Sequence, residues 1–73
     1  MISYVELDSL VEARGIAKIA DTAYTRQQGI VGNTVRVIGS SWYASEKNAQ
    51  VRYLDGPAEG LKDKLPVECL NMI

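Results

Sequence analysis

The sequence predicts a mainly β, α+β protein built on a small, strongly bent antiparallel sheet, preceded by a short N-terminal helix or strand. Three strand-like runs follow one another in the chain, at Ile30 to Ile38, Asn48 to Leu54 and Leu65 to Leu70. The connections between them are rich in Gly, Ser, Asp and Pro, the residues typical of turns. Consecutive strands joined by such turns normally pair antiparallel.

The first residues predict a short helix. Apolar side chains recur there at spacings of three and four: Tyr4, Leu7, Leu10 and Val11. Ser9 and Glu12 stand in the S-x-x-E relation of a capping box, and Gly15 is a suitable end for the helix. The alternative is an edge strand from Ile2 to Leu7 followed by a turn.

The stretch from Gly15 to Tyr24 fits neither a period of two nor a period of 3.6, because its Ile and Ala residues are irregularly spaced. We expect a strand in its first half. Thr25 to Gly29 follows as a polar connection, in which Gly29 is able to take a positive φ.

The run from Ile30 to Ile38 has the alternation of a half-buried strand. Its apolar side carries Val31, Val35 and Val37, and its polar side carries Thr34 and Arg36. Gly32-Asn33 predicts a bend or bulge at the start of this strand. The segment from Gly39 to Lys47 is predicted as a nine-residue connection, longer than a tight hairpin requires.

The two remaining strands alternate in the same way. In the second run the apolar positions are Ala49, Val51 and Tyr53, and in the third they are Leu65, Val67 and Cys69. Asp55-Gly56-Pro57 predicts a turn between them, with Gly60 closing the loop. Pro66 cannot donate a ladder hydrogen bond, so it predicts an edge or a strand start.

Composition limits the function. At 73 residues the chain makes one domain, in which residues 1–29 supply an N-terminal element and the first strand, and residues 30–73 supply the main core. Cys69 is alone and there is no His, so we expect neither a disulfide nor a structural metal nor any cofactor. No signal peptide or membrane span is evident, which predicts a cytoplasmic protein without membrane association.

With the strands placed, Val31-Gly32-Asn33-Thr34-Val35-Arg36-Val37-Ile38 resembles the opening strand of many SH3-like and KOW-type barrels. The tail Leu65-Pro66-Val67-Glu68-Cys69-Leu70 looks like their closing strand, so the resemblance implies an SH3-like core. KOW segments usually carry a Gly a few residues before their second strand, where this chain has Glu46-Lys47-Asn48. Domains of this kind commonly serve as docking modules in transcription, translation and photosynthetic adaptors.

The sequence disfavours an enzyme. General acid–base catalysis at neutral pH usually needs His or carboxylates tuned by burial, and no pair of acidic residues forms such a motif. Ser40-Ser41 has no His partner and is interpreted as a pair of turn residues. Cys69 is interpreted as a small buried hydrophobic residue.

Two groups of residues are candidates for partner binding. Trp42 and Tyr43 lie in the predicted long connection, where exposed aromatic side chains are typical anchors, although Trp42 is equally suited to plug one end of the core. The second group is basic and lies on the polar sides of the strands or next to them: Arg36, Arg52, Lys62 and Lys64. We expect them to share one face, either as a grip for an acidic protein patch or RNA, or as an ordinary solvated surface.

These observations predict a non-enzymatic protein-interaction module that binds a larger complex. In size and make-up the chain is similar to small phage-encoded regulators that bind bacterial RNA polymerase and inhibit or redirect transcription. A KOW-like RNA-binding domain, with Trp42 as a stacking platform beside the four basic residues, is one alternative, but a net charge of −1 disfavours nucleic acid as the main partner. A structural or adaptor subunit of a larger complex is another.

Overall fold

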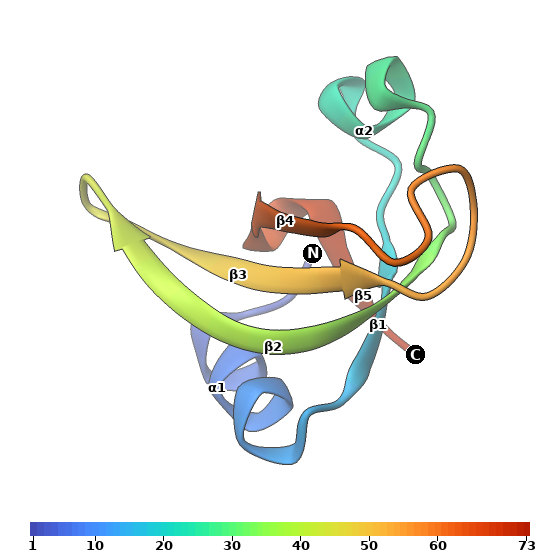
Figure 1. Cartoon of the computed structure of the whole chain (residues 1–73). Coiled ribbons are helices and arrows are strands. Elements are labelled where there is room, and N and C mark those ends of the chain that lie inside the picture. The colour runs from blue at the N-terminus through green and yellow to red at the C-terminus, as the bar shows by residue number, and fades with distance from the viewer.

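Five strands form one antiparallel sheet in the computed structural model of the protein, which describes residues 1–73. The strands are β1 (Ile16–Ile19), β2 (Thr34–Tyr43), β3 (Glu46–Tyr53), β4 (Lys62–Pro66) and β5 (Leu70–Met72). Their order is β4-β3-β2-β1-β5, and β2 and β3 curve strongly along their length (Figure 1). The predicted α+β class with a bent antiparallel sheet is confirmed. β4 and β5 are unpaired edges, so the sheet is not closed.

The first element is a helix, α1 (Tyr4–Ala13), as the apolar spacing predicts. The alternative edge strand at Ile2 to Leu7 is wrong. The predicted capping box is also wrong: Ser3 and Glu6 form it, with the Glu6 amide donating to Ser3 Oγ at 3.0 Å and the Ser3 amide donating to Glu6 Oε1 at 2.8 Å. This earlier start gives the helix enough length to bury both Leu7 and Leu10 against the sheet.

The next segment contains β1, where a strand was expected, and then a short helix, α2 (Ala23–Gln28), where a polar connection was expected. Thr22 and Thr25 form its capping box, and the buried Thr25 hydroxyl donates to the Ala20 carbonyl at 2.6 Å. Gly29 ends the helix at a φ of +70°, the positive value anticipated for it. Because α2 is polar and is fixed mainly by its caps, it has no apolar period for sequence reading to detect.

β2 and β3 form a long hairpin, which contradicts the predicted nine-residue connection. β2 continues to Tyr43 and β3 begins at Glu46, so only Ala44 and Ser45 remain for the turn. A β-bulge interrupts the register between Val37 and Gly39. The start of β2 is also later than predicted, since the strand begins at Thr34 and leaves Val31 42% exposed.

The last predicted strand is divided in two. β4 ends at Pro66, a 3₁₀ helix, η1 (Val67–Cys69), follows, and β5 then pairs with β1. Pro66 lies on an edge strand, as its missing donor predicts. The 3₁₀ helix lets the chain cross from one edge of the sheet to the other while Leu65 and Cys69 both stay buried.

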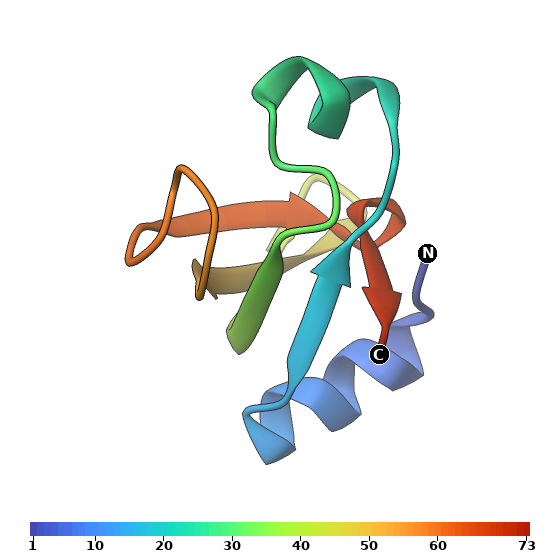
Figure 2. The ribbon, with the colours of Figure 1, turned by 90° about the vertical axis from the view of Figure 1, so that its right-hand side faces the viewer.

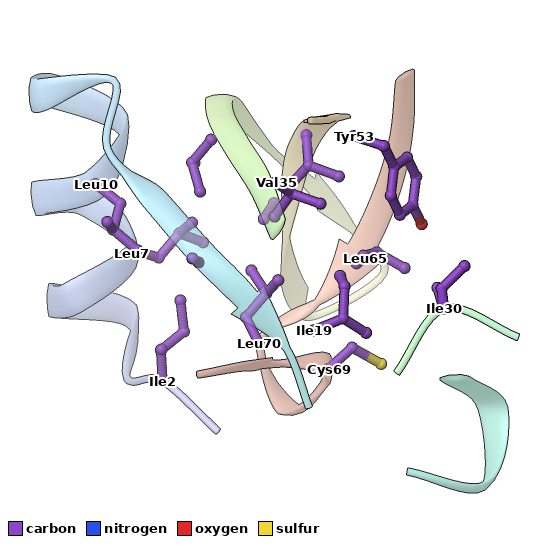
Figure 3. Close-up of a cluster of buried hydrophobic side chains, with 14 residues drawn as sticks. Ile2, Leu7, Leu10, Ile19, Ile30, Val35, Tyr53, Leu65, Cys69 and Leu70 are labelled. Atoms are coloured by element: carbon purple, nitrogen blue, oxygen red, sulfur yellow. The ribbon is translucent and has the colours of Figure 1, made fainter. Parts of the chain in front are cut away.

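Figure 2 shows α1 along one side of the sheet. The buried side chains of the core come from α1, from all five strands, from η1 and from Ile2 and Ile30. Leu7 and Leu10 project from α1 toward the strands, and Ile30 closes the side next to α2 (Figure 3). The predicted inward positions of β3, at Ala49, Val51 and Tyr53, are all buried. No helix in the protein has the length and apolar character needed to cross a membrane.

Candidate interaction surfaces

The sheet has an inner face, covered by α1, and an outer face open to solvent. Along β3 the inward side chains alternate with Gln50 and Arg52, which point outward. Residues of the neighbouring strands that are paired with Gln50 or Arg52 therefore also lie on the outer face.

Three cations stand in line across the outer face. Arg36 on β2 is paired directly with Arg52 on β3, and Arg52 is paired directly with Lys62 on β4. We call Arg36, Arg52 and Lys62 the cationic row. Lys64 lies one residue pair away, opposite Gln50, and all four side chains are exposed. The expectation that these residues share one face is confirmed, while their role in binding remains a prediction.

A fifth cation, Lys18 on β1, joins the same face. It is paired with Thr34, and it is exposed between the buried residues Ala17 and Ile19. Lys18 is not among the binding residues predicted from the sequence. The signal was present in the alternation of Ala17, Lys18 and Ile19, but that run was too short to settle its orientation.

No carboxylate neutralises the cationic row. The structure contains two ion pairs, Arg26 with Asp21 and Lys47 with Asp8, and neither involves the row. Arg36 Nη1 donates to the Arg14 carbonyl at 2.5 Å. Like charges placed directly opposite on a sheet destabilise it, so the row is an arrangement that stability alone does not favour.

Asp63 lies between Lys62 and Lys64 in the sequence but serves the other side of the strand. Its Oδ2 accepts a hydrogen bond from the Tyr53 hydroxyl at 2.9 Å. Burial, together with this carboxylate, raises the pKa of Tyr53 far above its ordinary value of 10.0. The tyrosine thus stays protonated, and Asp63 is engaged with it.

A shallow hollow of about 480 Å³ adjoins the cationic row. Its lining combines charged, amide and apolar groups: Ile38, Gln50, Lys62, Asp63 and Lys64. The hollow gives a partner side chain both an amide and an aliphatic contact beside the two lysines.

The second surface is the tip of the β2–β3 hairpin, where Trp42 is 64% exposed and Tyr43 is 78% exposed. Both residues lie at the end of strand β2. The prediction that they lie in a loop is wrong. The interpretation of Trp42 as a core plug is wrong, because Ile2, Leu7 and Leu10 close the core without it.

Trp42 is nonetheless held in place. Its ring meets the ring of Tyr4 edge-on, with centroids 5.8 Å apart and planes at 83°. Lys47 Nζ lies 6.0 Å from the Trp42 ring and pairs with Asp8, while the Lys47 amide donates to the Tyr4 hydroxyl at 3.0 Å. The start of α1 therefore orients the indole before any partner arrives.

Trp42 and the cationic row lie on opposite faces of the hairpin. Trp42 is paired with Lys47, whose side chain shares the inner face with Ala49 and Val51, whereas Tyr43 is paired with Glu46 on the outer side. The predicted RNA site, in which Trp42 stacks beside the four basic residues, is therefore not assembled by this fold.

Comparison of the chain with protein-family models, with curated proteins and with solved structures found no match.

Proposed function

We propose that this protein is a non-enzymatic interaction module that acts by binding a larger protein complex through the tip of its β2–β3 hairpin. The observation that carries this proposal is the exposure of Trp42 and Tyr43 at the tip, combined with the fixing of Trp42 by Tyr4 and Lys47. Tryptophan and tyrosine are enriched among the residues that dominate binding energies at protein interfaces.

The fixed orientation of the Trp42 indole favours binding of a partner. A rigid aromatic side chain loses little conformational entropy when a partner covers it, because its rotamer is already restricted. The exposed face of Trp42 still has most of its apolar area to bury. A partner with an apolar pocket fits this surface, since the Lys47 ammonium beside the ring is already paired with Asp8.

The specific partner in this proposal is bacterial RNA polymerase, met in the cytoplasm, with inhibition or redirection of transcription as the result. Its support is the similarity in size and make-up to small phage-encoded regulators. An SH3-like architecture is part of the same proposal. It is supported by the β2–β3–β4 meander and by the return of β5 to β1 after a 3₁₀ helix.

The test compares the wild-type protein with Trp42→Ala and with Tyr24→Ala, measuring binding to purified bacterial RNA polymerase by biolayer interferometry. Tyr24 is the matched control, because it is an exposed aromatic residue on α2, away from the tip. We expect Trp42→Ala to weaken binding at least tenfold and Tyr24→Ala to leave it within twofold. Absence of wild-type binding excludes polymerase as the partner, and equal binding by Trp42→Ala excludes the tip.

A second candidate, a KOW-like RNA-binding domain, is favoured by the cationic row alone. Filter binding with mixed RNA at low salt tests it. Retention that falls steeply with added salt supports it, and no retention dismisses it.

A further inference from the structure

We propose that the cationic row is a docking site for an acidic α-helix of a partner protein, laid across the strands with one carboxylate per helical turn against each cation. This surface is separate from the hairpin tip, so the inference does not rest on the function proposed above. It assigns a class of ligand to the outer face of the sheet.

The spacing of the row matches that of a helix. Neighbouring strands lie about 4.8 Å apart, so the backbone positions of Arg36, Arg52 and Lys62 follow one another at intervals of about that length. Successive turns of an α-helix are about 5.4 Å apart, and residues at i, i+3 and i+4 lie on one side of it. Glutamates or aspartates repeated at that spacing therefore meet the three cations in sequence.

The surroundings of the row fit the same ligand. Ile16 on β1 is paired with Arg36 and is 41% exposed, so it extends the row by one apolar position. At the other end, the hollow is lined by Lys62, Lys64, the Gln50 amide and Asp63, and the Asp63 carboxylate already accepts hydrogen bonds from the Tyr53 hydroxyl and the Lys64 amide. A helix with an acidic stretch followed by an apolar residue matches this order.

The distribution of charge favours a protein helix over nucleic acid. Five of the eight basic residues lie on this face, together with Glu46, so the rest of the molecule carries three basic residues against eight acidic ones. A nucleic acid carries charge continuously beyond the length of the row and would run over the acidic surroundings. A helix of three or four turns ends where the cations end.

The ligand also relieves the repulsion within the row. A carboxylate against each cation gives the directly opposed pairs Arg36–Arg52 and Arg52–Lys62 the counter-charge that they lack in the free protein. Arg52 belongs to both pairs, so we expect a substitution there to change peptide binding most.

The probe is a labelled 22-residue Ala/Leu-based helical peptide with glutamates at i, i+4, i+7 and i+11. A control peptide has the same composition with the glutamates spread around the helix. Fluorescence anisotropy at low salt is expected to show at least tenfold tighter binding of the one-sided peptide, with affinity that falls as salt is added. Equal affinity of the two peptides overturns the inference.

Two charge reversals locate the site. Arg52→Glu is expected to weaken binding of the one-sided peptide at least tenfold and to raise the melting temperature, whereas the matched reversal Arg26→Glu, on α2, is expected to change binding less than twofold. Unchanged binding by Arg52→Glu overturns the proposal. A measured melting temperature at or above the wild-type value shows that unfolding does not account for a loss of binding.

Two further arms separate the alternatives. Trp42→Ala is expected to bind the one-sided peptide as the wild type does. The proposal for the hairpin tip and the proposal for the cationic row can therefore fail independently of each other. The second arm measures binding of an oligouridine RNA. If the RNA binds more tightly than the one-sided peptide, the ligand is a nucleic acid and the inference is overturned.

Discussion

Arg36 and Arg52 stand directly opposite each other on the outer face of the sheet, with no carboxylate between them. Directly opposed like charges oppose strand pairing, so their juxtaposition is a stability defect at a surface that is otherwise well paired. A ligand with negative charge relieves this repulsion, which the unbound protein retains. The cost of the repulsion in free energy of unfolding can be measured directly.

Arg52→Glu is expected to stabilise the folded protein. The change converts two repulsive cross-strand pairs, with Arg36 and Lys62, into attractive ones, and each such pair is worth about 0.2–1 kcal/mol. Urea denaturation monitored by circular dichroism measures the gain in the free energy of unfolding. Arg52→Gln, which only removes the repulsion, is expected to give a smaller gain, and a lower stability of Arg52→Glu contradicts the like-charge interpretation.

Trp42→Ala is expected to destabilise the protein by about 1 kcal/mol or less, because the exposed indole contributes mainly one edge-on aromatic contact and one cation–π contact. Leu65→Ala is the contrasting variant, since its side chain is fully buried and its truncation costs about 2–5 kcal/mol. Thermal denaturation compares them. Similar losses in both variants mean that Trp42 belongs to the core.

Ser3→Ala is expected to destabilise the protein by about 1 kcal/mol, the usual contribution of a helix N-cap. Ser9→Ala lies inside α1 and is expected to be neutral or slightly stabilising, because alanine has the higher helix propensity. Urea midpoints of the two variants decide which S-x-x-E pair caps the helix. A loss of stability in Ser9→Ala alone contradicts the assignment of Ser3 as the N-cap of α1.

Stability is expected to fall at alkaline pH. The pKa of Tyr53 is raised by burial and by Asp63, so above pH 10 the unfolded chain loses this proton while the folded chain retains it. The unfolded state then binds fewer protons, and the free energy of unfolding decreases by up to about 1.4 kcal/mol per pH unit from this residue. Urea titrations between pH 8 and pH 11 measure the slope.

Tyr53→Phe removes the titrating hydroxyl and is the control for that measurement. Its stability is expected to decline less steeply above pH 10 than that of the wild type, although it loses the hydrogen bond to Asp63 at every pH. Parallel slopes in the two proteins assign the alkaline loss to other groups.

The Cys69 thiol is expected to react slowly in the folded protein. Burial raises its pKa, against a smaller opposing effect of the Thr22 hydroxyl, so little reactive thiolate forms near neutral pH. A thiol-reactive disulfide reagent followed by absorbance is expected to label the native protein far more slowly than the urea-unfolded protein. Immediate labelling of the native protein shows that the thiol is accessible.

Patterns in the sequence identified the inward residues of β3 and of α1. The alternation at Ala49, Val51 and Tyr53 and the helical spacing of Leu7 and Leu10 identified the inward residues, because burial forces a period on the apolar side chains. The outer end of the hairpin and α2 were missed for the complementary reason. They extend beyond the core, so burial imposes no period on them.

The two candidate surfaces show what only the tertiary structure decided. By alternation alone, Trp42 has the same parity as Arg36 and belongs on the cationic side of the strand. The bulge between Val37 and Gly39 inserts one residue into β2 and turns Trp42 to the other face, toward Tyr4. The alignment of Arg36 with Arg52 and Lys62 likewise depends on pairing between strands, which no single strand encodes.

The sequence by itself determined the α+β class, the inward residues of β3 and the identity of the candidate basic and aromatic binding residues. These follow from local periodicity and from the chemistry of each residue. The register of the sheet, its single bulge and the docking of α1 determined which of those side chains act together, because each depends on contacts between segments far apart in the chain.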